Sequence, residues 1–373
     1  LGNILRKLGN LEEAELSIRK AIEINPDLAE AHSNLGIILK NLGKLQEAEI
    51  STRKAIELNP NYAIAHSNLG NILKDLGQSQ EAELSIRKAI KLNPRYFDAY
   101  SELGIISRDH GNLKEAKLLQ LKAIEIKPDF FQAHRELAIC LYLLEDIDSA
   151  LNSIVKANSL EPTNITNQLL LTIFQKEKNL KDRNLEINNY KSNFTKKSLD
   201  TNPLMLNVPV EAELIDSLYK IKARDQEKHQ GPTYGDAIGS DYKLFERSES
   251  SINKIKEKLT NISRDFVKSD ILISESFFTI FRSGGGLRSH DHLSPLDKIK
   301  GLNIAEKKFS LVYYLSVGDQ KCDNPGILNL ENPNQDILPT NGLIIIFPAE
   351  RKHSVFYKGQ KDRIIIGVNF YRI

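Results

Sequence analysis

The stretch LGIILKNLGKLQEAEISTRKAIELNP, residues 35–60, decides the fold of the first half of the chain, because its pattern recurs every 34 residues up to about residue 162. A Leu-Gly pair, an alanine and a closing proline return in each copy. They are Leu1-Gly2, Leu35-Gly36, Leu69-Gly70, Leu103-Gly104 and the weaker Leu137-Ala138; Ala14, Ala48, Ala82, Ala116 and Ala150; and Pro26, Pro60, Pro94, Pro128 and Pro162. Small residues let two helices approach closely, and proline opens a helix but does not continue one. Each copy therefore predicts a pair of helices.

This pattern resembles the tetratricopeptide repeat (TPR), a 34-residue unit of two antiparallel helices, over nearly half of the chain. The resemblance implies five units that stack into a curved α-solenoid, with a capping helix at about residues 163–180. We therefore expect a first domain over residues 1–180, in which Gly43 marks one of the turns between paired helices.

A solenoid of this kind binds partners in the groove that its first helices line. Asn34 and Asn68 fall at equivalent positions of these helices, and we predict that they hydrogen-bond the backbone of a bound protein or peptide. The alternative, that both are ordinary solvated residues, stays open. Three histidines share one repeat position with a tyrosine and are interpreted as packing residues, not as metal ligands: His32, His66 and His134, with Tyr100.

The composition argues against several classes of protein. Basic and acidic side chains are nearly balanced, at 51 and 49 in 373 residues, so neither a nucleic-acid nor a membrane partner is expected. No apolar stretch approaches the roughly 18 residues of a membrane span. Cys140 and Cys322 form no metal or disulfide pattern, which favours a cytoplasmic location. Because Leu1 begins the chain in mid-pattern, we expect residues before it.

The pattern changes twice after the repeats. Residues 181–202 are rich in Lys, Asn and Ser and predict a polar linker before a second domain at 203–373. In that domain the periodicity predicts helices at 211–222 and 248–268, a loop at 231–241, and strands at 204–206, 271–281, 309–317, 326–330, 342–347, 353–357 and 363–371. Short, closely spaced strands of this kind indicate a sandwich or barrel.

Three histidines and one arginine of the strand-rich region point to chemistry. His290 and His292 are two residues apart, His353 follows a later strand, and Arg363 begins the last strand. Imidazole nitrogens bind transition metals, and a guanidinium pairs with a carboxylate through two parallel hydrogen bonds. The set predicts a mononuclear metal centre that also holds an anionic co-substrate.

The order of motifs here resembles the 2-oxoglutarate- and Fe(II)-dependent oxygenases, particularly their prolyl-hydroxylase-like bacterial branch, over about residues 203–373. The motifs are the histidine pair at a strand end, Tyr313-Tyr314, Gly326, the segment from Gly342 to His353, and Arg363. The resemblance implies a double-stranded β-helix (a jelly roll, cupin-like) with flanking helices. It also implies Fe(II), 2-oxoglutarate held by Arg363, dioxygen as co-substrate and ascorbate as an accessory reductant.

The family usually supplies a carboxylate two residues after the first histidine, where this chain has His292. We predict a three-histidine metal site of His290, His292 and His353, with Asp297 as the alternative ligand and no catalytic residue beyond the ligands. Tyr313 and Tyr314 are both candidates for a hydrogen bond to 2-oxoglutarate, because neighbouring residues of a strand face opposite sides. The inserted stretch 293–308 is expected to form a flap.

The sequence thus predicts a multidomain α plus β protein, an oxygenase that hydroxylates a protein or peptide recruited by the repeats. Two alternatives stay open. The first is a non-catalytic interaction or scaffold protein whose oxygenase-like domain is degenerate. The second is an oxygenase that acts on a small molecule or glycan, with repeats that serve only assembly.

Overall fold

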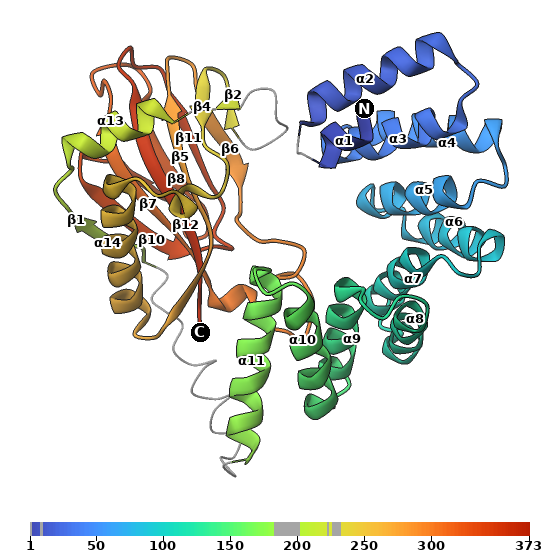
Figure 1. Ribbon diagram of the computed structural model, residues 1–373. Coiled ribbons are helices and arrows are strands. Elements are labelled where there is room, and N and C mark those ends of the chain that lie inside the picture. Colours follow the sequence, from blue (N-terminus) through green and yellow to red (C-terminus); the bar gives the residue numbers. More distant parts are fainter. Residues whose placement is uncertain (1, 8–9, 183–201, 222–223, 226–232) are drawn as a thin grey trace. The chain divides into compact units, whose positions relative to one another are not determined.

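The structure is a computed structural model that describes residues 2–7, 10–182, 202–221, 224–225 and 233–373. The chain divides into two compact units, Leu1–Asn179 and Leu180–Ile373 (Figure 1). Most of the polar linker predicted at 181–202 lies outside the described residues.

The N-terminal unit is a helical solenoid in which each helix packs on the next one along the chain (Figure 1). Its helices are α1 (Gly2–Lys7), α2 (Leu11–Ile24), α3 (Ala29–Asn41), α4 (Leu45–Leu58), α5 (Ala63–Asp75), α6 (Ser79–Leu92), α7 (Phe97–Asp109), α8 (Leu113–Ile126), α9 (Phe131–Leu143), α10 (Ile147–Leu160) and α11 (Ile165–Asp182). First helices of successive pairs also contact one another, as α3 does α5. These helices line the inner side of the solenoid.

The repeated glycines lie where the two helices of a pair cross. A Cβ atom built on Gly70 lies 2.3 Å from Cγ1 of Ile86 and 3.0 Å from the carbonyl oxygen of Ala82. Gly36 faces Thr52 and Gly104 faces Gln120 in the same way, one repeat to either side. The close approach of α5 to α6 therefore requires a residue without a side chain.

We expect Gly70→Val to lower the free energy of unfolding of the N-terminal unit by about 1–3 kcal/mol, because overpacking of a helix crossing costs about this much and exceeds the few tenths of a kcal/mol that valine gains over glycine in helix propensity. Urea unfolding followed by circular dichroism measures the change. Lys88→Val on the exposed face of α6 is the matched control and is expected to cost only about 0.5 kcal/mol. Equal losses in the two variants would contradict the packing argument.

A second repeated contact explains the histidines of the solenoid. Nε2 of His66 lies 3.0 Å from the carbonyl oxygen of Pro60, six residues earlier. The same contact joins His32 to Pro26, Tyr100 to Pro94, His134 to Pro128 and Gln168 to Pro162. These side chains tie each first helix to the preceding turn, and the contact of Gln168 marks α11 as the first helix of one more unit.

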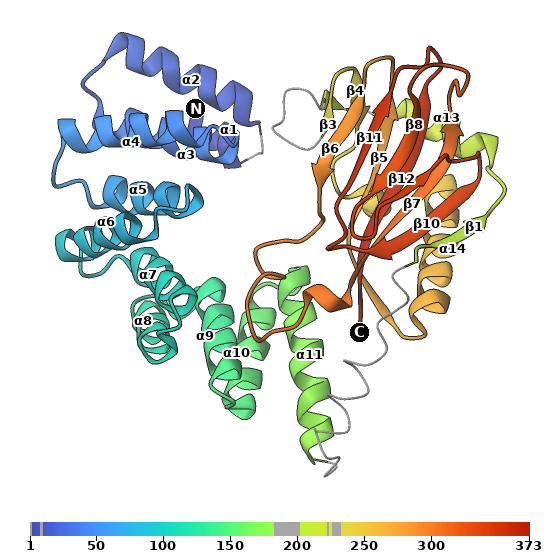
Figure 2. The ribbon, with the colours of Figure 1, turned by 180° about the vertical axis from the view of Figure 1, so that it is seen from behind.

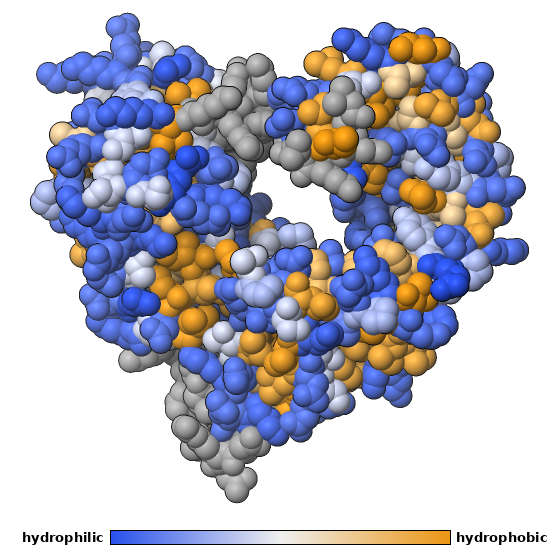
Figure 3. All heavy atoms as spheres, in the orientation of Figure 1, coloured by the Kyte–Doolittle hydropathy of each residue, from blue (hydrophilic) through white to orange (hydrophobic). Residues whose placement is uncertain are grey.

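Charged side chains connect the second helices of successive pairs. Arg53 pairs with Glu49 on its own helix and with Glu81 on the next second helix, and Arg19 and Arg87 repeat this arrangement one unit away. The arginine side chains are 43–46% exposed, so each pair contributes at most about 1 kcal/mol. The face of the whole chain that Figure 3 draws carries hydrophilic residues over most of its area, with hydrophobic residues between them.

The C-terminal unit contains two antiparallel sheets. Their strands are β1 (Leu204–Asn207), β2 (Arg224–Asp225), β3 (Thr233–Tyr234), β4 (Ala237–Gly239), β5 (Ile271–Phe281), β6 (Gly286–His290), β7 (Lys308–Val317), β8 (Pro325–Leu330), β9 (Gln335–Ile337), β10 (Leu343–Pro348), β11 (His353–Tyr357) and β12 (Arg363–Arg372). The seven-stranded sheet has the order β1-β10-β7-β12-β5-β4-β2 and the five-stranded sheet the order β3-β6-β11-β8-β9.

Two apolar clusters hold this unit together. One lies between the seven-stranded sheet and the helices α13 (Ala212–Lys220) and α14 (Ser250–Val267), which run along its outer face (Figures 1 and 2). The other lies between the two sheets, where Tyr314 and Phe347 of the larger sheet meet Val355 of the smaller one. The strands β7 and β12 are therefore buried on both faces. The short helices η1 (Leu244–Glu246) and η2 (Ala305–Lys307) lie in connections.

The prediction of a loop at residues 231–241 is wrong in part. Residues Thr233–Tyr234 and Ala237–Gly239 form β3 and β4, which pair with β6 and β5. Glycine and proline in this stretch indicated a loop, but the strands form because longer neighbours offer unpaired edges. The stretch therefore extends both sheets.

Candidate metal centre

The three C-terminal histidines lie at adjacent strand ends of the smaller sheet. His290 ends β6 and His353 begins β11, and the two are directly opposite each other in the antiparallel pairing of these strands. His292 follows two residues after His290, and its backbone N–H donates to the carbonyl oxygen of Ala349 at 2.9 Å. Pairing between distant strands thus brings the three residues together.

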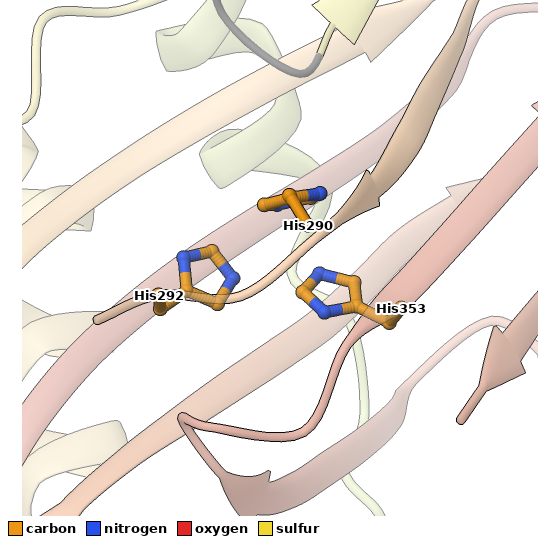
Figure 4. Close-up of side chains that lie close together, drawn as sticks. All are labelled: His290, His292 and His353. Carbon is orange, nitrogen blue, oxygen red and sulfur yellow. The ribbon is translucent and has the colours of Figure 1, made fainter. Parts of the chain in front are cut away.

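The three imidazole rings converge on one space (Figure 4). Ring centroids are 4.3 Å apart for His290 and His353, 4.9 Å for His292 and His353, and 5.0 Å for His290 and His292. One nitrogen from each ring lies within 4.8 Å of the others. We call these residues the histidine cluster; its geometry suits a single transition-metal ion bound by imidazole nitrogens.

Backbone contacts fix the orientation of two of the rings. Nδ1 of His290 lies 2.8 Å from the carbonyl oxygen of Arg288, and Nδ1 of His353 lies 3.4 Å from that of Arg351. A carbonyl oxygen only accepts, so both Nδ1 atoms carry the hydrogen and both Nε2 atoms offer a lone pair. This arrangement is typical of metal-binding histidines.

Burial keeps the cluster neutral. It lowers the pKa of His353 from 6.5 to about 3, and nearby His290 acts in the same direction. It also lowers the pKa of His290 and, more strongly, that of His292, which the other two rings lower further. All three rings are therefore unprotonated near neutral pH, which is the form that binds metal.

We expect the metal-free C-terminal unit to lose stability as the pH falls from about 7 to about 5. His353 titrates near 6.5 in the unfolded chain but only at about 3 when folded, so between these values the unfolded chain binds more protons and is favoured. Unfolding in urea at several pH values measures this loss. His353→Gln removes the titrating group and is expected to show a shallower dependence on pH; an equal slope in both proteins would contradict the assignment.

The alternative ligand Asp297 is engaged elsewhere. Its side chain is buried and forms an ion pair with Lys308 at 3.0 Å, and it accepts a hydrogen bond from Tyr371 at 2.9 Å. Its Oδ2 also accepts from the backbone and side chain of Ser294. Asp297 thus anchors the stretch 293–308 to β7 and β12, and among the described residues the metal-binding group contains only the three histidines.

Arg363 is a buried cation with unsatisfied donors. Its side chain is 1% exposed, and Nη1 donates to the carbonyl oxygen of Pro325 at 3.1 Å. Nε and Nη2 are buried and form no hydrogen bond of good geometry, although the Tyr314 hydroxyl lies near enough to stabilise the charge. The guanidinium lies 5.0 Å from the ring centre of Tyr314 and 6.0 Å from that of Tyr357, and burial lowers its pKa. A buried charge without a partner costs free energy, so an anion bound at these donors would stabilise Arg363.

The structure separates the two candidate tyrosines. Tyr314 faces Arg363 between the two sheets, whereas Tyr313 faces the helices and donates to the carbonyl oxygen of Pro209 at 3.0 Å. The prediction for Tyr313 is therefore wrong, because alternate residues of β7 face opposite sides of the sheet. Tyr357, which the sequence did not single out, is a second aromatic ring near the guanidinium.

The histidine cluster and Arg363 share the space between the sheets. His353 and Tyr357 face the same side of β11, four residues apart, which is about 13 Å along a strand. Arg363 lies beside Tyr357 and reaches back toward Pro325 of β8. A small dicarboxylate with metal-binding oxygens at one end fits these groups chemically: nitrogen ligands for the metal and a guanidinium edge for the far carboxylate.

The predicted partner-binding residues lie on the first helices of the solenoid. Asn34 is half-buried on α3, and Asn68 of α5 donates from its amide to Oγ of Ser33 at 2.9 Å. In later units the equivalent residues are Glu102 and Glu136, which pair with Lys74 and Arg108. The role of Asn34 and Asn68 in binding stays a prediction.

Comparison with known proteins identifies the repeats. Family models described as TPR repeat and tetratricopeptide repeat match residues 2–43, 29–62, 52–83 and 97–130. The N-terminal region therefore consists of tetratricopeptide repeats. Such repeats are scaffolds for binding proteins or peptides.

Solved structures similar to the chain include two that are described as TPR proteins. MamA is 27% identical, with 43% of this chain and 95% of that chain covered and a TM-score of 0.37. A thermophilic TPR protein of Thermus thermophilus, TTC0263, is 20% identical, with 47% and 95% covered and a TM-score of 0.43. YrrB, a TPR protein with an unusual peptide-binding site, is 23% identical, with 45% and 86% covered and a TM-score of 0.36.

A comparison with curated protein sequences gave no match. Within the described ranges, every helix is too short or too polar to cross a membrane.

Proposed function

Starting from an N-terminal scaffold of tetratricopeptide repeats, we propose that the C-terminal region is a 2-oxoglutarate- and Fe(II)-dependent dioxygenase that hydroxylates a protein or peptide recruited by the repeats. The observation that carries the proposal is the pairing of two features within one β-sandwich: three neutral imidazoles around one point, and a buried arginine with two unsatisfied donors. Each feature has a structural cost that a bound ligand offsets.

The order of the strands supports a double-stranded β-helix. Eight consecutive strands divide into β10-β7-β12-β5 in the larger sheet and β6-β11-β8-β9 in the smaller one. Two four-stranded sheets that exchange strands in this manner form a jelly roll. The histidine cluster and Arg363 belong to these eight strands and the residues that directly follow them.

The roles of the residues follow from their positions. His290 and His353 present Nε2 lone pairs toward the metal position, and His292 offers a third nitrogen. Arg363 binds the far carboxylate of 2-oxoglutarate through Nε and Nη2, while Tyr314 and Tyr357 exclude water from its guanidinium. Fe(II), 2-oxoglutarate and dioxygen would together supply the oxidising chemistry: one oxygen atom of dioxygen would enter succinate as carbon dioxide is released, and the other would enter the hydroxylated C–H bond.

The repeats suggest how the substrate arrives. Asn34 and Asn68 offer amide groups on the inner side of the solenoid, which suits the backbone of an extended peptide. We place this activity in the cytoplasm, where Cys140 and Cys322 stay as free thiols.

Succinate production tests the proposal. Purified protein loaded anaerobically with Fe(II) is supplied with 2-oxoglutarate, dioxygen and ascorbate, and succinate is measured against an Arg363→Met control. Turnover above the control supports an oxygenase. Metal binding without succinate formation, with or without added peptides, would instead favour the scaffold alternative. That alternative is the second candidate because this chain has His292 where the oxygenases usually have a carboxylate, and because the repeats are confirmed.

A further inference from the structure

A row of polar side chains crosses the buried part of the larger sheet beside the histidine cluster. Asn369 of β12 lies opposite Glu275 of β5 on one side and Ser310 of β7 on the other. Asn369 and Ser310 are each 1% exposed. The side-chain nitrogen of Asn369 also lies 3.2 Å from Nδ1 of His292. We call Glu275, Asn369 and Ser310 the polar row; the proposed function gives these residues no role.

The hydrogen bonds of the row have a fixed direction. A carboxylate only accepts, so the amide nitrogen of Asn369 must face Glu275, from which it lies 2.5 Å. Ser310 donates from Oγ to Oδ1 of Asn369 at 2.7 Å, which completes the other end of the amide. Both ends of Asn369 are thus determined by their neighbours, and its nitrogen is the end that meets His292.

This direction makes His292 different from the other two histidines. Its Nδ1 accepts from the amide of Asn369, so the hydrogen of the neutral ring is on Nε2. In His290 and His353 the hydrogen is on Nδ1, which faces a backbone carbonyl. His292 therefore presents an N–H group to the cluster, where the others present lone pairs.

Binding of a metal by Nε2 of His292 needs the opposite arrangement. The hydrogen must move to Nδ1, and Asn369 must turn its amide over so that Oδ1 accepts it. That turn places Oδ1 against the carboxylate oxygen of Glu275, where both atoms only accept. The carboxylate thus opposes the change.

We propose that Glu275 is a positioning residue which, through Asn369, holds the hydrogen of His292 on Nε2 and so weakens His292 as the third metal ligand. The expected effect on metal binding rests on the proposed function, but the position of the hydrogen on His292 does not depend on it. Glu275→Gln keeps the shape of the side chain and adds donors, so the amide of Asn369 is free to turn.

The position of the hydrogen is measured without metal. Nitrogen NMR of the imidazole rings is expected to show His292 with its hydrogen on Nε2 in the original protein and to shift toward Nδ1 in Glu275→Gln. Ser310→Ala is the matched control: it removes a neighbour of Asn369 but keeps the carboxylate, so His292 is expected to stay unchanged. A hydrogen on Nδ1 in the original protein overturns the proposal.

Cobalt(II) titration measures the consequence for the metal. Glu275→Gln is expected to bind Co(II) about tenfold more tightly, the scale of outer contacts of a metal site. Loss of a nearby negative charge alone has the opposite sign, because it weakens attraction of a cation. Weaker or unchanged binding of Co(II) by Glu275→Gln overturns the proposal. A gain in affinity that persists when Glu275→Gln is combined with His292→Ala overturns it as well. If neither the original protein nor the variants bind Co(II), the proposed function fails. The NMR measurement still tests the position of the hydrogen on His292.

Discussion

His353→Ala is expected to abolish metal binding by the C-terminal region, with a loss of affinity above about 100-fold. Substituting residues that merely orient a metal ligand costs roughly 10- to 100-fold, so removing a ligand costs more. His353 is 2% exposed, its ring centroid is 4.3 Å from that of His290 and 4.9 Å from that of His292, and its Nε2 lone pair is available because Nδ1 faces the carbonyl of Arg351. No other residue of the metal-binding group in the described chain replaces it.

Titration with Co(II) and metal analysis after gel filtration measure this loss. His134→Ala is the matched control, because His134 belongs to the solenoid, where its ring nitrogen contacts the carbonyl oxygen of Pro128. A thermal melt checks that the C-terminal unit of His353→Ala stays folded. Metal retained by a folded His353→Ala protein at the original affinity would remove the histidine cluster as the metal site.

Arg363→Met is expected to weaken binding of 2-oxoglutarate by at least about 100-fold and to leave metal binding unchanged. Each hydrogen bond from a charged donor contributes about 1.5–3 kcal/mol, and Nε and Nη2 together offer two. The methionine fills a similar volume without the buried charge. We therefore also expect the metal-free protein to melt at the same temperature or higher.

Calorimetric titration of the metal-loaded protein with 2-oxoglutarate, and a melt of the metal-free protein, give the two results. Arg282→Met is the matched control, since Arg282 is an exposed arginine with only long ion pairs to Asp236 and Asp362. A clear drop in melting temperature without loss of 2-oxoglutarate binding would show that Arg363 serves the fold alone.

Much of the fold could be predicted from the sequence because its patterns are local. The 34-residue period fixes which residues of each helix face the next, and the small residues at Gly70 and Ala82 permit the close crossing. In the C-terminal unit the strand predicted at 271–281 coincides with β5, and that at 353–357 with β11. Alternation and turn residues carry this information within a few neighbouring positions.

Less of the candidate site was predictable, because its contacts join distant strands. Neither Tyr313 nor Tyr314 could be chosen, since both faces of β7 are buried and the sequence shows no polar side. The polar row was missed as well. Its one signal was a lone Asn369 within the apolar run of β12, but its partners Glu275 and Ser310 are defined only by the register of three strands.

The sequence by itself determined the repeats, most of the strands, and the candidate residues His290, His292, His353 and Arg363. Only the tertiary structure decided that the three rings meet, that Asp297 forms an ion pair with Lys308, and that Arg363 is buried with unsatisfied donors. The physical reason is range. Helix and strand patterns arise from residues a few positions apart, whereas the approach of His290 to His353 depends on how β6 pairs with β11, two strands that are separated in the chain by four others.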